Sequence, residues 1–272
     1  TNAKRPVLYV GHGAVISGAG KAVIRLAEKL RAPIVNTLLG KGAADETHPL
    51  HLGMLGMHGT AYANKAVDHC DLIMAIGARW DDRITGKLDE FCVDAVKIHI
   101  DIDPAEFGKM VKPDVAIAGD ARLVLEEMIP LVSPADTKAW LDQCEVWRQR
   151  YPLRYAKQGG LRAQHVLDRL HAVTRGDAIV TTDVGQHQMW AAQFYHFEQP
   201  NRWMTSGGLG TMGYGLPASI GVQVAHPDAL VINVAGEASW LMNMQEMGTA
   251  MQFRAPVKQF ILNNERMGMV RQ

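Results

Sequence analysis

The strongest constraint on the fold is a series of short segments that are apolar throughout and are separated by helical stretches. Leu72–Ile76, with the sequence LIMAI, is the clearest of them. A strand of this kind has no polar face, which is typical of a parallel sheet covered by helices on both sides. Strands and helices alternate along most of the chain. This alternation predicts an α/β fold built on doubly wound parallel sheets.

The predicted elements form two series separated by a polar segment. In residues 1–132 strands are expected at Pro6–Val10, Pro33–Asn36, Asp71–Ile76, Val96–Ile102 and Val115–Ala118, and helices at Gly20–Arg31, Thr60–Asp68 and Arg122–Ile129. In residues 161–272 strands are expected at Ala178–Thr182, Leu230–Val234 and Val257–Leu262, and helices at Arg162–Val173, His187–Tyr195, Gly215–Ala225 and from Ser239 onward. We expect two α/β domains, with residues 133–160 as a partly helical linker.

The second series is short for a domain with buried parallel strands, so we expect its sheet to be incomplete at the C-terminus. The sequence also begins without methionine. We therefore interpret the chain as a piece of a longer polypeptide. A parent of roughly 550–600 residues would hold three domains of about 100–200 residues each.

Composition excludes several classes of protein. Basic and acidic residues balance at 28 each, which gives no reason to expect a nucleic acid or an anionic membrane as partner. The three cysteines, Cys70, Cys92 and Cys144, are widely spaced and odd in number, so a reducing, cytoplasmic location is expected. No apolar run approaches the ~20 residues of a membrane span, and no signal peptide is recognisable.

Polar side chains follow two successive strands near the end of the chain. Gly236-Glu237-Ala238-Ser239 follows one strand, and Asn263-Asn264 follows the next. In a parallel sheet both ends lie at the same edge, where α/β proteins bind ligands. A carboxylate and an amide oxygen beside a helix N-terminus suit a diphosphate bridged by magnesium. The alternative is an ordinary βαβ unit with polar residues at its strand ends.

Two further turns are expected at the same edge. Asp183–Gln188 joins a strand to a helix, and Ser206–Gly213 contains four glycines in eight residues. Glycine permits a positive φ and a close approach of the backbone to a ligand. One such loop could be a turn without a ligand. Three polar turns at successive strand ends favour a binding site.

The motifs in these turns resemble a known enzyme family. GQHQMWAAQ (Gly185–Gln193), SGGLGTMGYGLPA (Ser206–Ala218) and the GEAS…NN block are similar to the thiamine-diphosphate-binding domain of the acetohydroxyacid (acetolactate) synthases. MLGMHGTAYAN (Met54–Asn64) and GARWDDRITGK (Gly77–Lys87) resemble the central, FAD-binding domain of that family. The resemblance covers nearly the whole chain, and its MHG and DDR blocks point to the biosynthetic, flavin-containing type.

The resemblance implies roles for individual residues. Glu237 and Asn264 would ligate Mg²⁺ by side chain and Arg266 by its backbone carbonyl. Thiamine diphosphate would contact Gly185, Gln186, His187, Gly210, Met212, Gly236, Ala238, Ser239 and Met269. FAD would contact Gly56, Met57, His58, Thr60, Gly77, Arg79, Asp81, Arg83, Asp101, Ile102, Gly119 and Asp120. The activating glutamate of the family belongs to a domain N-terminal to this region, so no catalytic residue is expected in the chain.

The flavin positions also have a reading from the residues themselves. Arg79 follows a predicted strand, where its guanidinium could hold a pyrophosphate in bidentate fashion, and Asp101 and Asp120 could accept bonds from ribose or adenine. Alternatively, Arg79, Asp81, Asp82 and Arg83 form a surface ion-pair cluster. The Gly11-His12-Gly13 turn lacks the third glycine of a dinucleotide fingerprint, because Ile16 stands in its place.

The metal site departs from the pattern of the wider family of thiamine enzymes. That pattern is Gly-Asp-Gly, whereas this chain has Gly236-Glu237-Ala238. Glutamate reaches further and less rigidly than aspartate, and Mg²⁺ demands near-octahedral geometry at about 2.0–2.1 Å. Alanine replaces glycine without strain only where φ is negative. We expect metal binding to be retained, with lower affinity.

The resemblance also implies a reaction and partners. The parent would condense pyruvate with a second 2-ketoacid such as 2-ketobutyrate, losing CO₂, in branched-chain amino acid biosynthesis. It would act as a homodimer or tetramer, with a regulatory small subunit, and this chain alone would be inactive. The alternatives are another thiamine-diphosphate carboligase or decarboxylase (glyoxylate carboligase, pyruvate oxidase) or a non-catalytic nucleotide-binding fragment.

Overall fold

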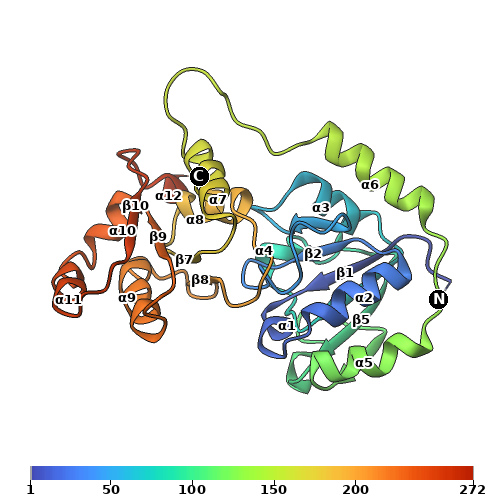
Figure 1. Cartoon of the computed structure of the whole chain (residues 1–272). Coiled ribbons are helices and arrows are strands. Elements are labelled where there is room, and N and C mark those ends of the chain that lie inside the picture. The colour runs from blue at the N-terminus through green and yellow to red at the C-terminus, as the bar shows by residue number, and fades with distance from the viewer. Residues whose placement is uncertain (1, 272) are drawn as a thin grey trace. The chain divides into compact units, whose positions relative to one another are not determined.

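The computed structural model describes residues 2–271, which fold into two compact units (Figure 1). Unit 1 runs to Leu153 and includes Glu198–Pro200, and unit 2 comprises Arg154–Phe197 and the chain from Asn201 onward. Each unit is built on one parallel sheet, so the predicted α/β fold class is confirmed. Among residues 2–271, no helix has both the length and the apolar character needed to cross a membrane.

Unit 1 contains a six-stranded sheet in the order β3-β2-β1-β4-β5-β6. Its strands are β1 (Pro6–Val10), β2 (Ile34–Asn36), β3 (His51–Met54), β4 (Leu72–Ile76), β5 (Val96–Asp101) and β6 (Val115–Ala118). All neighbouring strands are parallel. The order reverses between β1 and β4, as in doubly wound dinucleotide-binding folds, and ligands bind such sheets in the crevice at that point.

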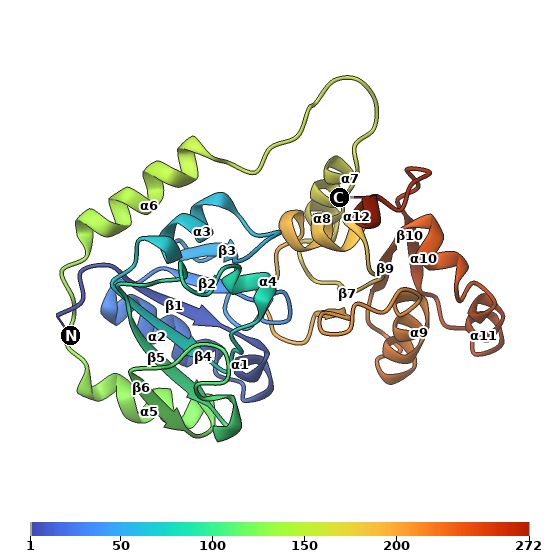
Figure 2. The same cartoon turned by 180° about the vertical axis from the view of Figure 1, so that it is seen from behind.

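Helices cover both faces of this sheet (Figures 1 and 2). Alternate residues of β1 point to opposite faces, so Leu8 and Val10 join one apolar cluster and Val7 and Tyr9 the other. The first cluster takes in residues of α1 (His12–Ile16), α2 (Gly20–Leu30) and α5 (Ala121–Leu131), and the second those of α3 (Ala61–Asp68) and α6 (Lys138–Arg150). The short helices α4 (Asp82–Thr85) and η1 (Pro104–Glu106) follow β4 and β5.

Helix α6 lies within the segment that the sequence suggested as a linker. It contacts α3, and its side chains Trp140 and Cys144 are buried in the same apolar cluster. Trp140 Nε1 donates a hydrogen bond to the Pro6 carbonyl at 3.1 Å. The part of residues 133–160 that forms α6 therefore packs on unit 1.

Unit 2 contains a four-stranded parallel sheet in the order β10-β9-β7-β8. Its strands are β7 (Ile179–Thr182), β8 (Trp203–Thr205), β9 (Val231–Ala235) and β10 (Lys258–Ile261). Its helices are α7 (Ala163–Thr174), α8 (Gln186–Phe194), α9 (Gly215–Ala225), α10 (Glu237–Leu241), α11 (Glu246–Gln252) and α12 (Gly268–Arg271). Strands β7, β9 and β10 end side by side, which places the turns after them at one edge.

The structure differs from the sequence prediction after β9. The prediction of one helix from Ser239 is wrong, because the helix begins at Glu237, ends at Leu241 and is followed by a second helix, α11. Asn243 lies in the break, where its side-chain amide donates to the Gly213 carbonyl at 2.6 Å. A side chain that bonds a distant backbone group holds this segment in a turn rather than in a continuous helix.

Candidate functional site

A carboxylate and an amide oxygen meet at the edge of the unit 2 sheet. Glu237 begins α10 directly after β9, and Asn264 follows the adjacent strand β10. Glu237 Oε1 accepts the Arg266 backbone N–H at 2.8 Å, and Asn264 Oδ1 accepts the same N–H at 3.1 Å. Both side-chain oxygens therefore lie around one point. Oxygen ligands of this kind suit Mg²⁺, and the longer glutamate side chain brings its carboxylate to the same backbone N–H as Asn264.

Two helices begin beside this oxygen pair. Helix α8 starts after Gly185 and α10 after Gly236, and neither glycine supplies a side-chain cap. The first N–H groups of a helix have no partner within the helix. Together with the positive end of the helix dipole, these N–H groups form a site for an anion.

A cavity of about 230 Å³ lies between these turns, within unit 2. Every residue that the sequence predicted for thiamine diphosphate or metal lines it: Gly185, Gln186, His187, Gly210, Met212, Gly236, Glu237, Ala238, Ser239, Asn264, Arg266 and Met269. Ser239 is almost fully buried, and its hydroxyl donates to the Val184 carbonyl at 3.0 Å. This bond ties the start of α10 to the turn before α8.

His187 carries a polar atom that has no protein partner. Its side chain is buried, and Nε2 makes no hydrogen bond within the described part of the chain. Burial lowers the pKa of His187 to about 4, against the opposing effects of a backbone hydrogen bond with Asp183 and of the Glu237 carboxylate. The ring is therefore neutral near pH 7. It lies so close to Gly185 and Gly236 that a Cβ on either would come within 2.7 Å of a ring atom.

The sequence missed several residues of this cavity, of which Gly268 is the most informative. A Cβ on Gly268 would overlap the Gln186 side-chain amide, so a larger residue there would displace that side chain. No local pattern marks Gly268, because its constraint comes from a side chain 82 positions earlier. Trp190 also lines the cavity, and its position four residues after Gln186 on one helix face was a usable signal. Val184, Leu262, Met267 and Val270 complete the missed residues.

In unit 1 the predicted flavin residues gather at the carboxyl edge of the sheet. Gly77 follows β4 at the point where the strand order reverses, with φ of 55°. Its carbonyl accepts the Gly13 N–H at 2.9 Å, and a Cβ on Gly77 would lie 2.7 Å from the Ala14 nitrogen. Only glycine fits there. The turn after β1 and the turn after β4 thus pack against each other at the edge of the sheet where such folds bind a dinucleotide.

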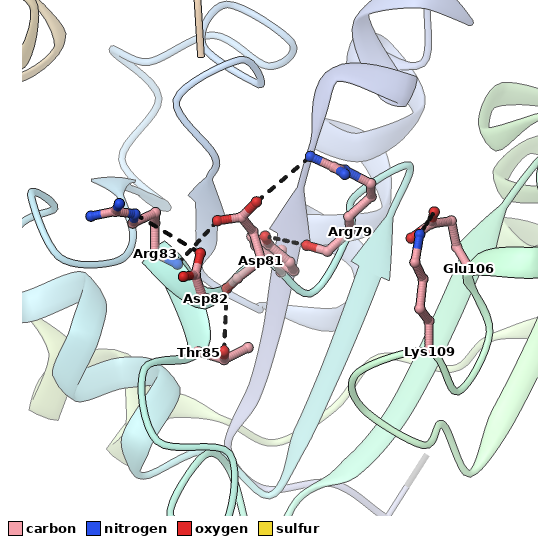
Figure 3. A network of polar contacts seen from close by, with 8 residues as sticks. Arg79, Asp81, Asp82, Arg83, Thr85, Glu106 and Lys109 are labelled. Atoms are coloured by element: carbon pink, nitrogen blue, oxygen red, sulfur yellow. Dashed lines mark hydrogen bonds and ion pairs between the residues drawn. The ribbon is translucent and has the colours of Figure 1, made fainter. Parts of the chain in front are cut away.

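The Arg79–Arg83 segment forms two ion pairs at this edge of the sheet (Figure 3). Arg79 Nη2 lies 3.6 Å from Asp81 Oδ2, and Arg83 Nε lies 3.9 Å from Asp82 Oδ1. These side chains are largely exposed, as the surface-cluster interpretation expects. They also stand at the ligand edge of the sheet, so the structure is compatible with both interpretations of this segment.

The MHG turn contacts this segment directly. The Met57 N–H donates to the Arg83 carbonyl at 2.8 Å, and Asn64 holds both the N–H and the carbonyl of Gly56 at 3.0 Å. Burial, and then the Arg83 charge, lower the pKa of His58. Thr60 is nearly buried and caps α3 by accepting the Ala63 N–H at 3.1 Å. Its hydroxyl therefore serves the fold.

The last four flavin positions follow β5 and β6. Asp101 accepts the Asp103 N–H at 2.9 Å, and its carbonyl accepts the Gly119 N–H at 2.9 Å. Asp120 caps α5 by accepting the Leu123 N–H at 3.0 Å. Ile102 is 75% exposed and, like Met57 at 64%, offers an apolar surface beside these polar groups. An exposed guanidinium, carboxylates and apolar side chains at one edge fit a flavin dinucleotide.

Comparison with known proteins agrees with this arrangement. Residues 1–128 match the thiamine pyrophosphate enzyme central domain, and residues 183–272 match the C-terminal TPP binding domain. The acetolactate synthase large subunit of Cyanidium caldarium is 50% identical over 99% of this chain and 47% of its own length. The isozyme 3 large subunit of Escherichia coli is 48% identical over 99% of this chain and 48% of its own.

A plant relative extends the same picture. The chloroplastic acetolactate synthase of Arabidopsis thaliana is 45% identical over the whole of this chain and 41% of its own length. The chain thus spans less than half the length of these relatives. It covers the central domain and the cofactor-binding domain in the order that the motifs predicted. The chain belongs to the thiamine pyrophosphate enzymes, and its relatives among them are the acetolactate synthase large subunits.

Proposed function

We propose that the protein to which this chain belongs is an acetolactate synthase, and that unit 2 holds Mg²⁺ and the diphosphate of thiamine diphosphate. The reaction joins pyruvate to a second 2-ketoacid, with loss of CO₂, giving 2-acetolactate or 2-aceto-2-hydroxybutyrate. The single observation that carries the proposal is the oxygen pair of Glu237 and Asn264 beside two uncapped helix N-termini.

The residues of unit 2 would divide the work of binding. Glu237, Asn264 and the Arg266 carbonyl would hold the cation, and the first turns of α8 and α10 would hold the diphosphate. Neutral His187 would direct its unpartnered Nε2 toward a diphosphate oxygen. Met212 and Met269 would supply apolar surface to the rings. Thiamine diphosphate supplies the electron sink for decarboxylation, and the protein supplies its placement.

Unit 1 would bind FAD at the edge of the sheet where β1 and β4 end. Arg79 and the backbone of Gly77 would face the pyrophosphate, and Asp101 and Asp120 would reach ribose or adenine. Asp120 keeps a second oxygen for a ligand after capping α5, whereas Asp101 Oδ2 lies 3.8 Å from His99 Nε2. Flavin absorbance that copurifies with the chain and is lost in Arg79→Ala is the expected result. A colourless wild-type chain that takes up no added FAD would contradict it.

Calorimetry of the 272-residue chain tests the metal site. We expect thiamine diphosphate to bind only when Mg²⁺ is present, and Glu237→Asp to bind it as tightly as wild type or more tightly, since aspartate holds the metal more rigidly. Weaker binding by Glu237→Asp would show that the backbone is adapted to the longer side chain. Binding that ignores Mg²⁺ would contradict the metal site itself.

Assays of the parent protein test the reaction. We expect 2-acetolactate from pyruvate without any electron acceptor, and 2-aceto-2-hydroxybutyrate when 2-ketobutyrate is added. Acetate formation that requires an electron acceptor would instead indicate a pyruvate oxidase, and a product from glyoxylate alone a glyoxylate carboligase. The isolated chain is expected to be inactive, because the family's activating glutamate belongs to another domain. Shared sites of that kind also imply a dimer or tetramer, joined by a small subunit.

A further inference from the structure

The turn that carries Met212 is built from residues that do not fix their own conformation. Gly210 and Gly213 flank the methionine with φ of 65° and 87°, a region that glycine enters as readily as negative φ. Ser206 Oγ accepts the Thr211 N–H at 2.9 Å and closes the base of the loop. Leu209 at its tip is 96% exposed. The position of Met212 in the cavity must therefore be set from outside the loop.

Asp183 holds the loop from the side of the sheet. It is fully buried at the end of β7, and its Oδ1 accepts the Gly215 N–H at 3.1 Å. Burial raises the pKa of Asp183, and the nearby backbone N–H groups of Gly215, Gly213 and Tyr214 oppose that rise. These N–H groups belong to the start of α9, an 11-residue helix whose dipole favours an anion at this end. Asp183 Oδ2 has no partner in the described chain.

Asn243 bonds the same segment at Gly213. Its Nδ2 donates to the Gly213 carbonyl at 2.6 Å. A Cβ on Gly213 would lie 2.7 Å from that nitrogen, so the bond depends on glycine at this position. The Gly213–Gly215 segment is thus bound by Asp183 at the Gly215 N–H and by Asn243 at the Gly213 carbonyl. Neither Asp183 nor Asn243 lines the cavity in which Met212 lies.

We propose that Asp183 and Asn243 are positioning residues, which clamp the Gly213–Gly215 segment and thereby hold the preceding Met212 in the cofactor cavity. The inference rests on the proposed function, because it assigns Met212 to the thiamine rings. Asp183 also immediately precedes the Val184–His187 turn at the diphosphate end. One buried carboxylate therefore connects the Val184–His187 turn, which would hold the diphosphate, to the turn that carries Met212, which would contact the rings. This connection fixes the position of each end of the cofactor relative to the other.

A double-mutant cycle in the full-length parent protein tests the clamp. Asn243→Asp keeps the shape but removes the donor, and Asn243→Ala removes it without adding a charge. Each is expected to lower kcat about tenfold, since small displacements at a reacting centre have effects of this size, while KM for pyruvate changes less than about twofold. The Kd of thiamine diphosphate with Mg²⁺ should rise about tenfold. Gln252→Glu, an exposed amide-to-acid change on α11, controls for charge.

The same cycle distinguishes the clamp from a general structural role. Met212→Ala should weaken cofactor binding and lower kcat by itself, and Asn243→Ala should then add little to it. If the fold-changes in kcat and Kd of the two single variants simply multiply in the double variant, the clamp is wrong. The proposed function is then unaffected. If Met212→Ala changes neither kcat nor Kd, both the ring contact and the clamp are wrong. Asp183→Asn is expected to weaken cofactor binding in the same way and to lower Tm.

Discussion

The two units differ in how the polar groups at the carboxyl edge of their parallel sheets are hydrogen-bonded. In unit 1 three of the polar side chains that follow strands have backbone partners, because Thr60, Asp81 and Asp120 each cap a helix. In unit 2 the helices α8 and α10 start at glycine without a side-chain cap, and His187 Nε2 is buried without a partner among residues 2–271. These three residues at the candidate flavin site are satisfied within the fold, whereas His187 at the candidate diphosphate site is not.

This difference decides how each unit responds to its ligand. A buried polar atom without a partner carries its full desolvation penalty, of about 1–3 kcal/mol, until a ligand satisfies it. Ligand binding should therefore stabilise unit 2, because the ligand removes this desolvation penalty. A ligand that binds only the native state also adds its binding free energy to the free energy of unfolding. Unit 1 should keep the shape of its turns whether or not a dinucleotide is bound.

The largest expected effect is an acid sensitivity of ligand-free unit 2. Burial lowers the pKa of His187 to about 4, below the 6.5 expected of the unfolded chain. The unfolded state then binds more protons between these values, so stability is full above pH 6.5 and falls as pH drops toward 4. At about 1.4 kcal/mol for each pKa unit, the loss approaches about 3 kcal/mol. Denaturant unfolding at pH 7 and pH 4.5 measures it.

A histidine replacement isolates this contribution from the other titrating groups. His187→Gln is neutral at both pH values, so the difference in stability between pH 7 and pH 4.5 should shrink by most of that amount. His226→Gln, an exposed histidine in the same unit, controls for the loss of a histidine. If the His187 and His226 variants keep the same pH profile as wild type, His187 is not the buried neutral group that the contrast between the units requires.

The next effect concerns the close approach of Gly268 to Gln186. Gly268→Ala should displace the Gln186 side chain and weaken binding of thiamine diphosphate with Mg²⁺ about tenfold, or about 1.4 kcal/mol. Gly221→Ala is the matched control, because among residues 2–271 no atom outside its chain neighbours and its own helix backbone lies within 4 Å of its Cβ position in α9. That control should instead raise stability by about 0.5–1 kcal/mol. Equal affinity in the two variants would mean that Gln186 does not shape the site.

The sequence predicts most of the fold because its signals are local. Apolar strands such as Leu72–Ile76 and helices such as Gly215–Ala225 appear in the structure within a residue of their predicted ends. The strands β3 and β8 were missed. The first has four residues and includes Gly53, and the second has three, so neither gives a period long enough to recognise.

The limits of prediction at the site have the same physical origin. Glu237 and Asn264 could be paired in advance, because strand ends in a parallel sheet meet at one edge. Gly268, Asp183 and Asn243 could not be assigned, since each depends on one atom contributed by a distant segment. The break between α10 and α11 belongs to this class, because Asn243 is held by Gly213 on a different turn. Such tertiary constraints leave no periodic trace in the sequence.

The smallest expected effect concerns unit 1, where Asp120 already has a backbone partner. Asp120→Ala removes the cap of α5 and should destabilise unit 1 by about 1 kcal/mol, a fall in Tm of about 2–4 °C, with no flavin present. Asp120→Asn keeps an acceptor for the Leu123 N–H and should cost little stability, while losing the negative charge that would face a ribose or adenine. Thermal unfolding of the flavin-free chain, followed by flavin titration, separates the two roles. If Asp120→Ala unfolds like wild type, the carboxylate is free for a ligand, and the contrast between a self-satisfied unit 1 and a ligand-dependent unit 2 fails at this position.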